Sequence, residues 1–297
     1  MMLQSVVRDC LYLNWALPAA ALPSPPAPLR YQLHPFQGED HVFASAVLFH
    51  QEGLHLQSLP RLRLSYPQCN LRLYVLDGDG IPAVLFHRML MPLWLVPGVR
   101  LISQQPAASA RFLFPRPSRD PGDGEWRWRV EKGESLTVRA WQDSPTVGQG
   151  PKLGNWEQTV DYIVERPRGY AVEDGVLHRV KAQHPRVAVW PLRAEIAEGG
   201  LLERLLPLTH GAQWPALHST WLCPEIPFVF ELGFVPKMQV APTLPQAAAS
   251  RSAARVRLPE GGEVTIPPLP ALQTLPEREE EACCVASGSG PLRPCAP

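Results

Sequence analysis

Asn70, Arg72 and Tyr74 form the most suggestive polar pattern in this sequence, because one apolar residue separates each from the next. Strict alternation predicts a strand with one polar and one apolar face, so the three side chains share a face. Arginine suits bidentate capture of a carboxylate, and tyrosine adds a hydroxyl. If this face is internal, the guanidinium needs an anion or a partner carboxylate, for which Glu165 and Glu225 are candidates. If it faces solvent, it is simply the polar side of a half-buried strand, and alternation alone does not decide.

His184 and His218 are the other candidates for chemistry, as general acid/base groups or as structural hydrogen-bonding residues. No acidic partner can be assigned to either from the sequence. No zinc-ligand spacing, phosphate-binding glycine loop or Ser-His-Asp arrangement is present, so no metal or cofactor is expected. The run Asp77–Gly80 resembles the start of a calcium loop but lacks the downstream ligands, and it predicts a turn.

The element that must position Arg72 is a β-hairpin over Gln68–His87, in which Asp77–Gly80 forms the turn and Ala83–Phe86 returns. Two further hairpins are predicted, over Trp126–Trp141 and Gly169–Lys181.

Other short strands and a few short helices complete the expected fold. The strands are expected over Leu11–Leu17, Leu29–Pro35, His41–Phe49, Ala110–Phe114 and Val187–Leu192. Helices are expected over Gly154–Glu165 and Leu201–Leu206, with a short or kinked piece over Arg88–Val96. The 35 prolines argue against long helices. The sequence therefore predicts a β-rich α+β fold, either a barrel or a strongly curved antiparallel sheet.

Composition limits the binding partners and the cellular location that can be expected for the protein. The 28 basic residues balance the 28 acidic ones, which argues against nucleic-acid binding. No apolar run is long enough to span a membrane. The six cysteines show no CxxC pair and are expected to be free thiols. The apolar segment Cys10–Leu22 resembles a signal peptide, but Arg8-Asp9 and Asn14-Trp15 argue against one, so a cytoplasmic location is expected.

One domain is expected over residues 1–242, followed by a disordered tail over residues 243–297. The tail is rich in proline, alanine and glutamate and has no periodic apolar face. Such a segment cannot bury enough apolar surface to offset its chain entropy.

The order of several motifs resembles a known family. The motifs are Leu11–Pro18 (LYLNWALP), Cys69–Val75 (CNLRLYV), Ile163–Val172 (IVERPRGYAV), Val180–Leu192 (VKAQHPRVAVWPL) and Pro215–Ser219 (PALHS). Together they resemble the YqjF-like family of uncharacterised bacterial proteins, which is grouped with the acetoacetate-decarboxylase-like superfamily. The resemblance implies a β-rich, barrel-like fold around an internal cavity, and it implies no particular reaction.

The decarboxylase that gives the superfamily its name uses a lysine Schiff base, with a second lysine lowering the pKa of the first. This sequence has no adjacent lysine pair. Lys132 falls in a predicted turn and Lys152 in a loop, so Lys181 is the only lysine that is a candidate to line a pocket. Schiff-base chemistry is therefore not expected.

Two classes of function remain open. The first is a pocket protein, enzymatic or not, that binds a small anionic or carbonyl compound through Asn70, Arg72, Tyr74, His184 and His218. The second is a non-catalytic interaction module whose tail recruits a partner. An interior cavity containing Arg72 would favour the first, and a solid interior with an exposed apolar patch would favour the second.

Overall fold

Long strands dominate the fold. The computed structural model describes residues 2–114, 125–142, 151–209, 212–232, 238–239, 255–257 and 263–265 of the chain. The strands are β1 (Met2–Pro18), β2 (Arg30–Tyr31), β3 (Leu33–Phe36), β4 (Glu39–Leu56), β5 (Leu64–Leu76), β6 (Pro82–Met91), β7 (Ala107–Ser109), β8 (Arg111–Leu113), β9 (Trp126–Lys132), β10 (Glu134–Gln142), β11 (Arg168–Glu173), β12 (Val176–Gln183), β13 (Trp190–Glu198), β14 (Ser219–Leu232), β15 (Met238–Gln239), β16 (Arg255–Arg257) and β17 (Glu263–Thr265). The helices are α1 (Val96–Ser103), α2 (Trp156–Val164) and α3 (Gly200–Leu205), with 3-10 turns η1 (Ala19–Ala21) and η2 (Leu93–Leu95).

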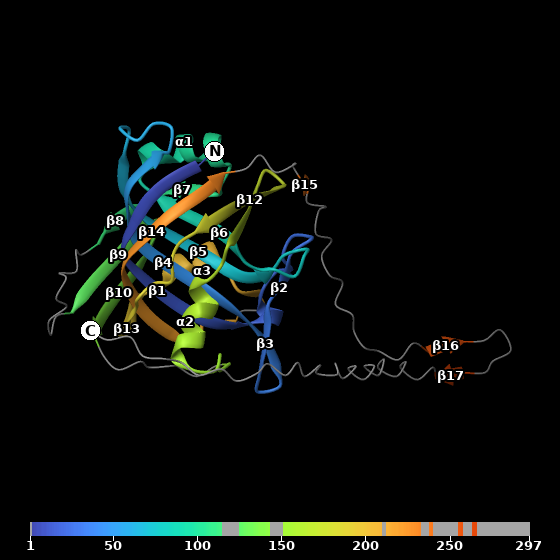
Figure 1. Ribbon diagram of the computed structural model, residues 1–297. Coiled ribbons are helices and arrows are strands. Elements are labelled where there is room, and N and C mark those ends of the chain that lie inside the picture. Colours follow the sequence, from blue (N-terminus) through green and yellow to red (C-terminus); the bar gives the residue numbers. More distant parts are fainter. Residues whose placement is uncertain are drawn as a thin grey trace, which may run out of the picture. The chain divides into compact units, whose positions relative to one another are not determined.

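Seven of these strands pair in a closed path, in the order β12-β11-β6-β5-β4-β1-β14. The path closes because Val180–Gln183 of β12 also pairs with Val229–Leu232 of β14. Figure 1 shows these strands wound around a common interior. The sheet is mixed, since β6 runs parallel to both β11 and β7. The fold is thus β-rich and curved, as expected, and parallel pairings of β6 interrupt its mainly antiparallel sheet.

Irregular positions in β1 and β4 bend the sheet. The pairing of β1 with β4 shifts register between Gln4 and Val6 and again between Arg8 and Leu11. Asp9, inside the second shift, has a φ of 52°. Such bulges increase the local bend and twist of a strand. Strands of this length therefore curve enough for β12 to meet β14.

A second group of strands, β13, β10, β9 and β8, continues from β14 beside the ring. The largest hydrophobic core lies between the two groups: Trp128, Val130 and Val138 pack there with Leu11 and Leu13 of β1. The predicted alternation in the Trp126–Trp141 hairpin is confirmed, because Trp126 and Trp128 face this core and Arg127 faces solvent. This core holds the outer face of the ring strands in place.

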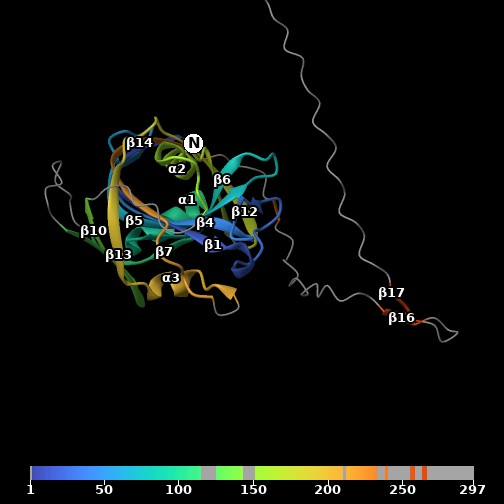
Figure 2. The ribbon, with the colours of Figure 1, turned by 90° about the horizontal axis from the view of Figure 1, so that it is seen from below.

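The inner face of the ring carries a second core, to which α2 contributes Val160, Ile163 and Val164. Asn155 begins this helix with a capping box in which Gln158 is the partner, so free amide groups at its first turn are satisfied. In Figure 1, α2 lies at the lower end of the ring and α1 at the upper end, and Figure 2 shows both helices within the outline of the strands. The two helices therefore lie near opposite ends of the ring interior.

Two expected elements are wrong in part. The segment expected as a helix over Arg88–Val96 begins as strand, because β6 continues to Met91 and the helix α1 starts only at Val96. Leu90 and Met91 are both fully buried, which is typical of a strand covered on both faces. The strand expected over Val187–Leu192 begins only at Trp190.

By its internal contacts the chain divides into two units, Met1–Leu244 and Pro245–Pro297. In the second unit the structure describes only the short hairpin of β16 and β17. The rest of the predicted tail lies outside the described residues, so its disorder stays a prediction. No helix among the described residues is long and apolar enough to cross a membrane.

Candidate functional site

A cavity of about 520 Å³ lies inside the ring of strands. Alternate residues of β5 line one wall: Leu64, Tyr66, Gln68, Asn70 and Arg72. The predicted alternation of this strand is therefore confirmed, and its polar face is the inner one. Tyr74 shares that face but is fully buried below the cavity instead of lining it.

Arg72 lies at the inner end of this polar row. Its Nη2 donates to the carbonyl oxygen of Ile163 and to the hydroxyl of Tyr74, both at 3.0 Å. Its guanidinium also lies 5.2 Å from the ring centre of Tyr12. Its Nε is buried and has no hydrogen-bond partner. Burial acts to lower the pKa of Arg72, but the neighbouring Tyr74 and Tyr12 hydroxyls more than offset this and raise it, so the group is a fixed cation.

Arg166 is a second cavity-lining arginine, and the sequence reasoning missed it. Its Nε donates to the carbonyl oxygen of Tyr162 at 2.7 Å, and its Nη1 to Gln32 Oε1 at 2.8 Å. The guanidinium packs on the Tyr162 ring, 4.2 Å from its centre. Burial lowers the pKa of Arg166, and the positive charge of Arg72 acts in the same direction. The two arginines are thus close enough to repel each other.

The C-terminus of α2 explains why two arginines tolerate this interior. The last carbonyl groups of a helix have no partner within it and carry partial negative charge. Ile163 and Tyr162 supply two of these carbonyls, one to each arginine. A carbonyl dipole neutralises only part of a guanidinium charge. No ion pair joins Arg72 or Arg166 to a carboxylate anywhere in the part of the chain that the structure describes.

The carboxylates suggested as partners for Arg72 do not reach it. Glu225 pairs with Arg8, and Glu165 is exposed at the end of α2. Lys181 pairs with Glu231 at 3.3 Å and does not line the cavity, whereas its neighbours in β12 on either side do. The described lining contains no aspartate, glutamate or lysine. The charge that the cavity presents is therefore positive.

A buried hydrogen-bond network supports Arg72 from below. The Tyr74 hydroxyl lies 2.8 Å from the Ser45 hydroxyl and 3.1 Å from the Ile163 carbonyl oxygen. Ser45 donates to Asn14 Oδ1 at 2.6 Å, and Asn14 donates onward to the Ser219 carbonyl. These side chains and backbone carbonyls come from four different strands and the helix α2, so they fix Tyr74, and through it Arg72, against the helix end.

The histidines predicted as site residues take different places. His184 lines the cavity and packs edge-on against Phe228. His218 is buried outside the cavity, beside Phe43, and its Nε2 lies 3.0 Å from the Pro151 carbonyl oxygen. Burial lowers the pKa of His218. The structure therefore brings Asn70, Arg72 and His184 to one cavity and leaves His218 in the packed core.

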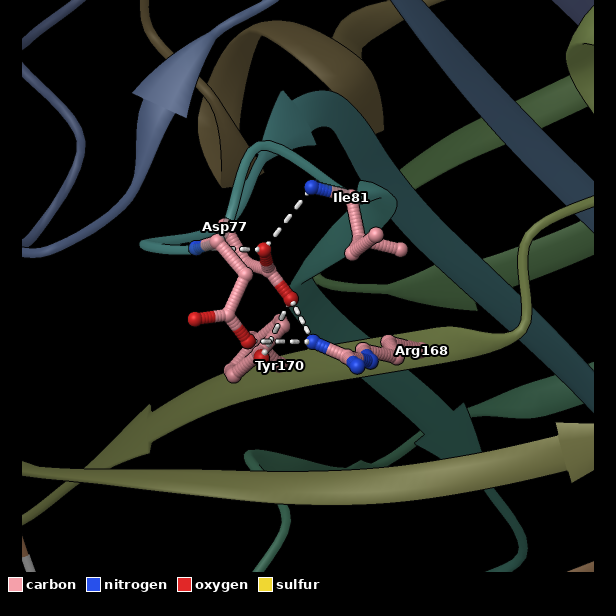
Figure 3. Close-up of polar contacts among 5 residues, drawn as sticks. Asp77, Ile81, Arg168 and Tyr170 are labelled. Carbon is pink, nitrogen blue, oxygen red and sulfur yellow. Dashed lines mark hydrogen bonds and ion pairs between the residues drawn. The ribbon is translucent and has the colours of Figure 1, made fainter.

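The turn of the central hairpin anchors the segment that carries Arg166. Asp77, buried at the turn, accepts hydrogen bonds from the backbone amides of Asp79 and Ile81 and from the side chains of Arg168 and Tyr170 (Figure 3). Arg168 lies two residues after Arg166. The turn thus ties β5 and β6 to the start of β11 and fixes the position of Arg166.

Comparison with known proteins agrees with this architecture. The family DUF2071, described as an uncharacterized conserved protein (COG2071), matches residues 5–220. The chain belongs to this family, which is the YqjF-like family that its motifs resemble. No curated protein matches the sequence.

Two solved structures are similar in fold. The enduracididine biosynthesis enzyme MppR, complexed with the condensation product of pyruvate and imidazole 4-carboxaldehyde, aligns with a TM-score of 0.50 and 12% identity over 77% of this chain and 87% of its own. An acetoacetate decarboxylase-like enzyme from Sphingomonas wittichii RW1 aligns with a TM-score of 0.48 and 15% identity over 80% of this chain and 94% of its own. The fold of this chain is thus similar to that of MppR, and at this identity the likeness concerns the fold alone.

Proposed function

We propose that the protein binds a small organic anion inside the ring, with Arg72 and Arg166 holding the negative charge. One observation carries the proposal: two guanidinium groups border the same cavity, and neither pairs with a carboxylate in the described chain. Burying a cation without a counter-charge is costly, and a ligand that brings the charge offsets that cost. A carboxylate also matches the fork of donors that a guanidinium presents.

The neighbourhood of Arg72 supports this assignment. Its Nε is buried without a partner, so an anion there would satisfy a donor that the protein leaves unmet. Asn70, two residues before Arg72 on the same face of β5, also lines the cavity. Its Oδ1 accepts from Gln68 Nε2 at 2.7 Å, which directs its amide as a donor toward other groups. A carbonyl or hydroxyl oxygen near the anionic group would find a hydrogen-bond donor in this amide.

The chemistry that we propose does not involve a lysine Schiff base. The described lining contains no lysine, and Lys181 pairs with Glu231 away from the cavity. MppR, similar in fold, is an enzyme and was observed with a condensation product of pyruvate. A carbonyl-containing carboxylate is accordingly one member of the ligand class that we propose. Binding of the anion does not depend on whether a reaction follows.

The alternative, an interaction module without a ligand, rests on a different feature. Leu93, Trp94, Leu101 and Ile102, from η2 and α1, are exposed apolar side chains. The interior, however, is hollow and contains Arg72, which favours the pocket protein over the module.

Calorimetry with benzoate and acetoacetate tests the proposal, with the corresponding amides as uncharged controls. Arg72→Gln and Arg166→Gln should each weaken carboxylate binding by about one to two decades, since each removes a charge-assisted hydrogen bond. Arg88→Gln is the matched control, because Arg88 is exposed on β6 and does not line the cavity. Equal binding by all three variants, or equal binding of acid and amide, would refute the proposal.

A further inference from the structure

The cavity extends along β5. Its β5 wall runs from Arg72 to Leu64. At about 3.3 Å per residue this wall spans roughly 26 Å. An elongated ligand can therefore lie along this wall.

The polarity of the cavity changes along its length. Its two fixed cations, Arg72 and Arg166, lie together at the end of α2. Apolar side chains cover most of the remaining wall, namely Val47, Phe49, Val84, Phe86, Met89, Met91, Leu95, Val99, Ile102, Phe228 and Phe230. The cavity thus has one cationic end and a mainly apolar body.

The other end is apolar up to the surface. Leu59, Leu62, Trp94 and Ile102 line the cavity and are also between 54% and 67% exposed. Exposed apolar side chains gathered at one place usually mark a binding site. Here they lie on the cavity itself, at the end that α1 borders, so an apolar group leaving the interior meets more apolar surface.

From this extent and polarity we infer that the ligand is an elongated amphipathic carboxylate, with an apolar tail that runs from the arginine pair toward α1. The inference rests on the proposed function and names its ligand class. At about 30 Å³ for each water-sized group, the cavity accommodates on the order of fifteen non-hydrogen atoms. A straight-chain monocarboxylate of about 10 to 14 carbons fills it. A carboxylate of four carbons satisfies the arginines and leaves the apolar body empty.

A chain-length series tests this directly. We would measure the affinities of butyrate, hexanoate, octanoate, decanoate and dodecanoate by calorimetry, below their micelle concentrations. Each buried methylene should tighten binding about fourfold. The gain should continue to about ten carbons or beyond and then level off as the cavity fills.

A variant at Gly98 locates the tail. Gly98 lies in α1 and lines the cavity, and nothing lies within 4 Å of a Cβ atom placed there. Gly98 is exposed at the rim of the cavity, so Gly98→Trp should fold, place an indole at this outer end and weaken dodecanoate binding at least tenfold, while leaving butyrate binding unchanged. Leu101→Trp is the matched control on the same helix, since Leu101 is 81% exposed and does not line the cavity.

The outcomes separate this inference from the proposed function. Carboxylate binding that depends on Arg72 but not on chain length would overturn the inference and leave the proposed function standing. Dodecanoate that binds equally well to Gly98→Trp and to the wild type would overturn it too, because the tail would then lie elsewhere. Failure of every carboxylate to bind would refute the proposed function and the inference together.

Discussion

Replacing Asp77 with asparagine should destabilise the protein by about 2–4 kcal/mol, because a buried carboxylate loses its charge. Asp77 is 3% exposed and accepts four hydrogen bonds, two from backbone amides and two from Arg168 and Tyr170. Asparagine keeps one acceptor oxygen but turns an amide toward donors. The turn that fixes the β5–β6 hairpin against β11 is thereby weakened.

The magnitude follows from the exposure of the partner. A hydrogen bond to a charged group contributes about 1.5–3 kcal/mol, and removing one member of a fully buried ion pair costs about 3–5 kcal/mol. The Arg168 side chain is 25% exposed and keeps a 3.0 Å contact with Asp79. The loss of stability should therefore stay below the roughly 5 kcal/mol that a fully buried ion pair can cost. For a unit of this size, a loss of about 3 kcal/mol lowers the melting temperature by roughly 10 °C.

Urea denaturation at neutral pH measures this loss, with Asp79→Asn as control. The Asp79 side chain is 75% exposed, so its replacement should change stability by no more than about 0.5 kcal/mol. Equal losses for the two variants would refute the reasoning.

The pH dependence gives a second, independent readout. Burial acts to raise the pKa of Asp77, but hydrogen bonds from Arg168, Ile81, Tyr170 and Asp79 outweigh it and lower the pKa. The carboxylate therefore stabilises the fold above its ordinary pKa of about 3.9, and this contribution is lost as the pH falls through the folded-state pKa. The stability difference between wild type and Asp77→Asn should be constant from pH 7 to about pH 4 and shrink below that. A difference that grows on acidification would contradict the assignment.

Three further predictions concern the cavity wall, the tail and the lysines. Gly169→Ala should cost about 1–3 kcal/mol in a thermal melt, because a Cβ there would lie 2.5 Å from Phe86; an unchanged melting temperature would contradict this packing. Truncation after Pro242 should leave the melting temperature unchanged, since the tail's composition offers no periodic apolar face; a large loss would mean that the tail packs on the domain. Borohydride with acetoacetate should leave the protein's mass unchanged, and an adduct on Lys181 would overturn the absence of Schiff-base chemistry.

The local structure of the site was predictable from sequence to a useful degree. Alternation placed Asn70, Arg72 and Tyr74 on one face of a strand, and Asp77–Gly80 identified the turn, because both signals depend only on neighbouring residues. Whether that face lies inside depends on ring closure, through the pairing of β12 with β14. Such a long-range contact leaves no local pattern. The family resemblance, and not the alternation, pointed to an internal cavity.

The position of Arg166 at the cavity could not be predicted from a sequence pattern. It lies one residue beyond the helix cap, between Glu165 and Pro167, where no alternation or helical periodicity applies. The available signal was the preference for basic residues near a helix C-terminus, which is weak in a chain rich in arginine. For His218 the residue type left two interpretations open, an acid/base group or a structural hydrogen-bonding residue, and its ring nitrogens lie near Pro151 and Ser219 within the core.

The anion site itself can be tested most directly by a crystal structure of the protein soaked in sodium bromide, because anomalous scattering locates bromide without any assumption about the organic ligand. We expect a bromide ion inside the ring, within hydrogen-bonding distance of Arg72 Nε and beside Arg166. Bromide bound only at surface arginines, or an Arg72 side chain turned out of the cavity, would contradict the central claim.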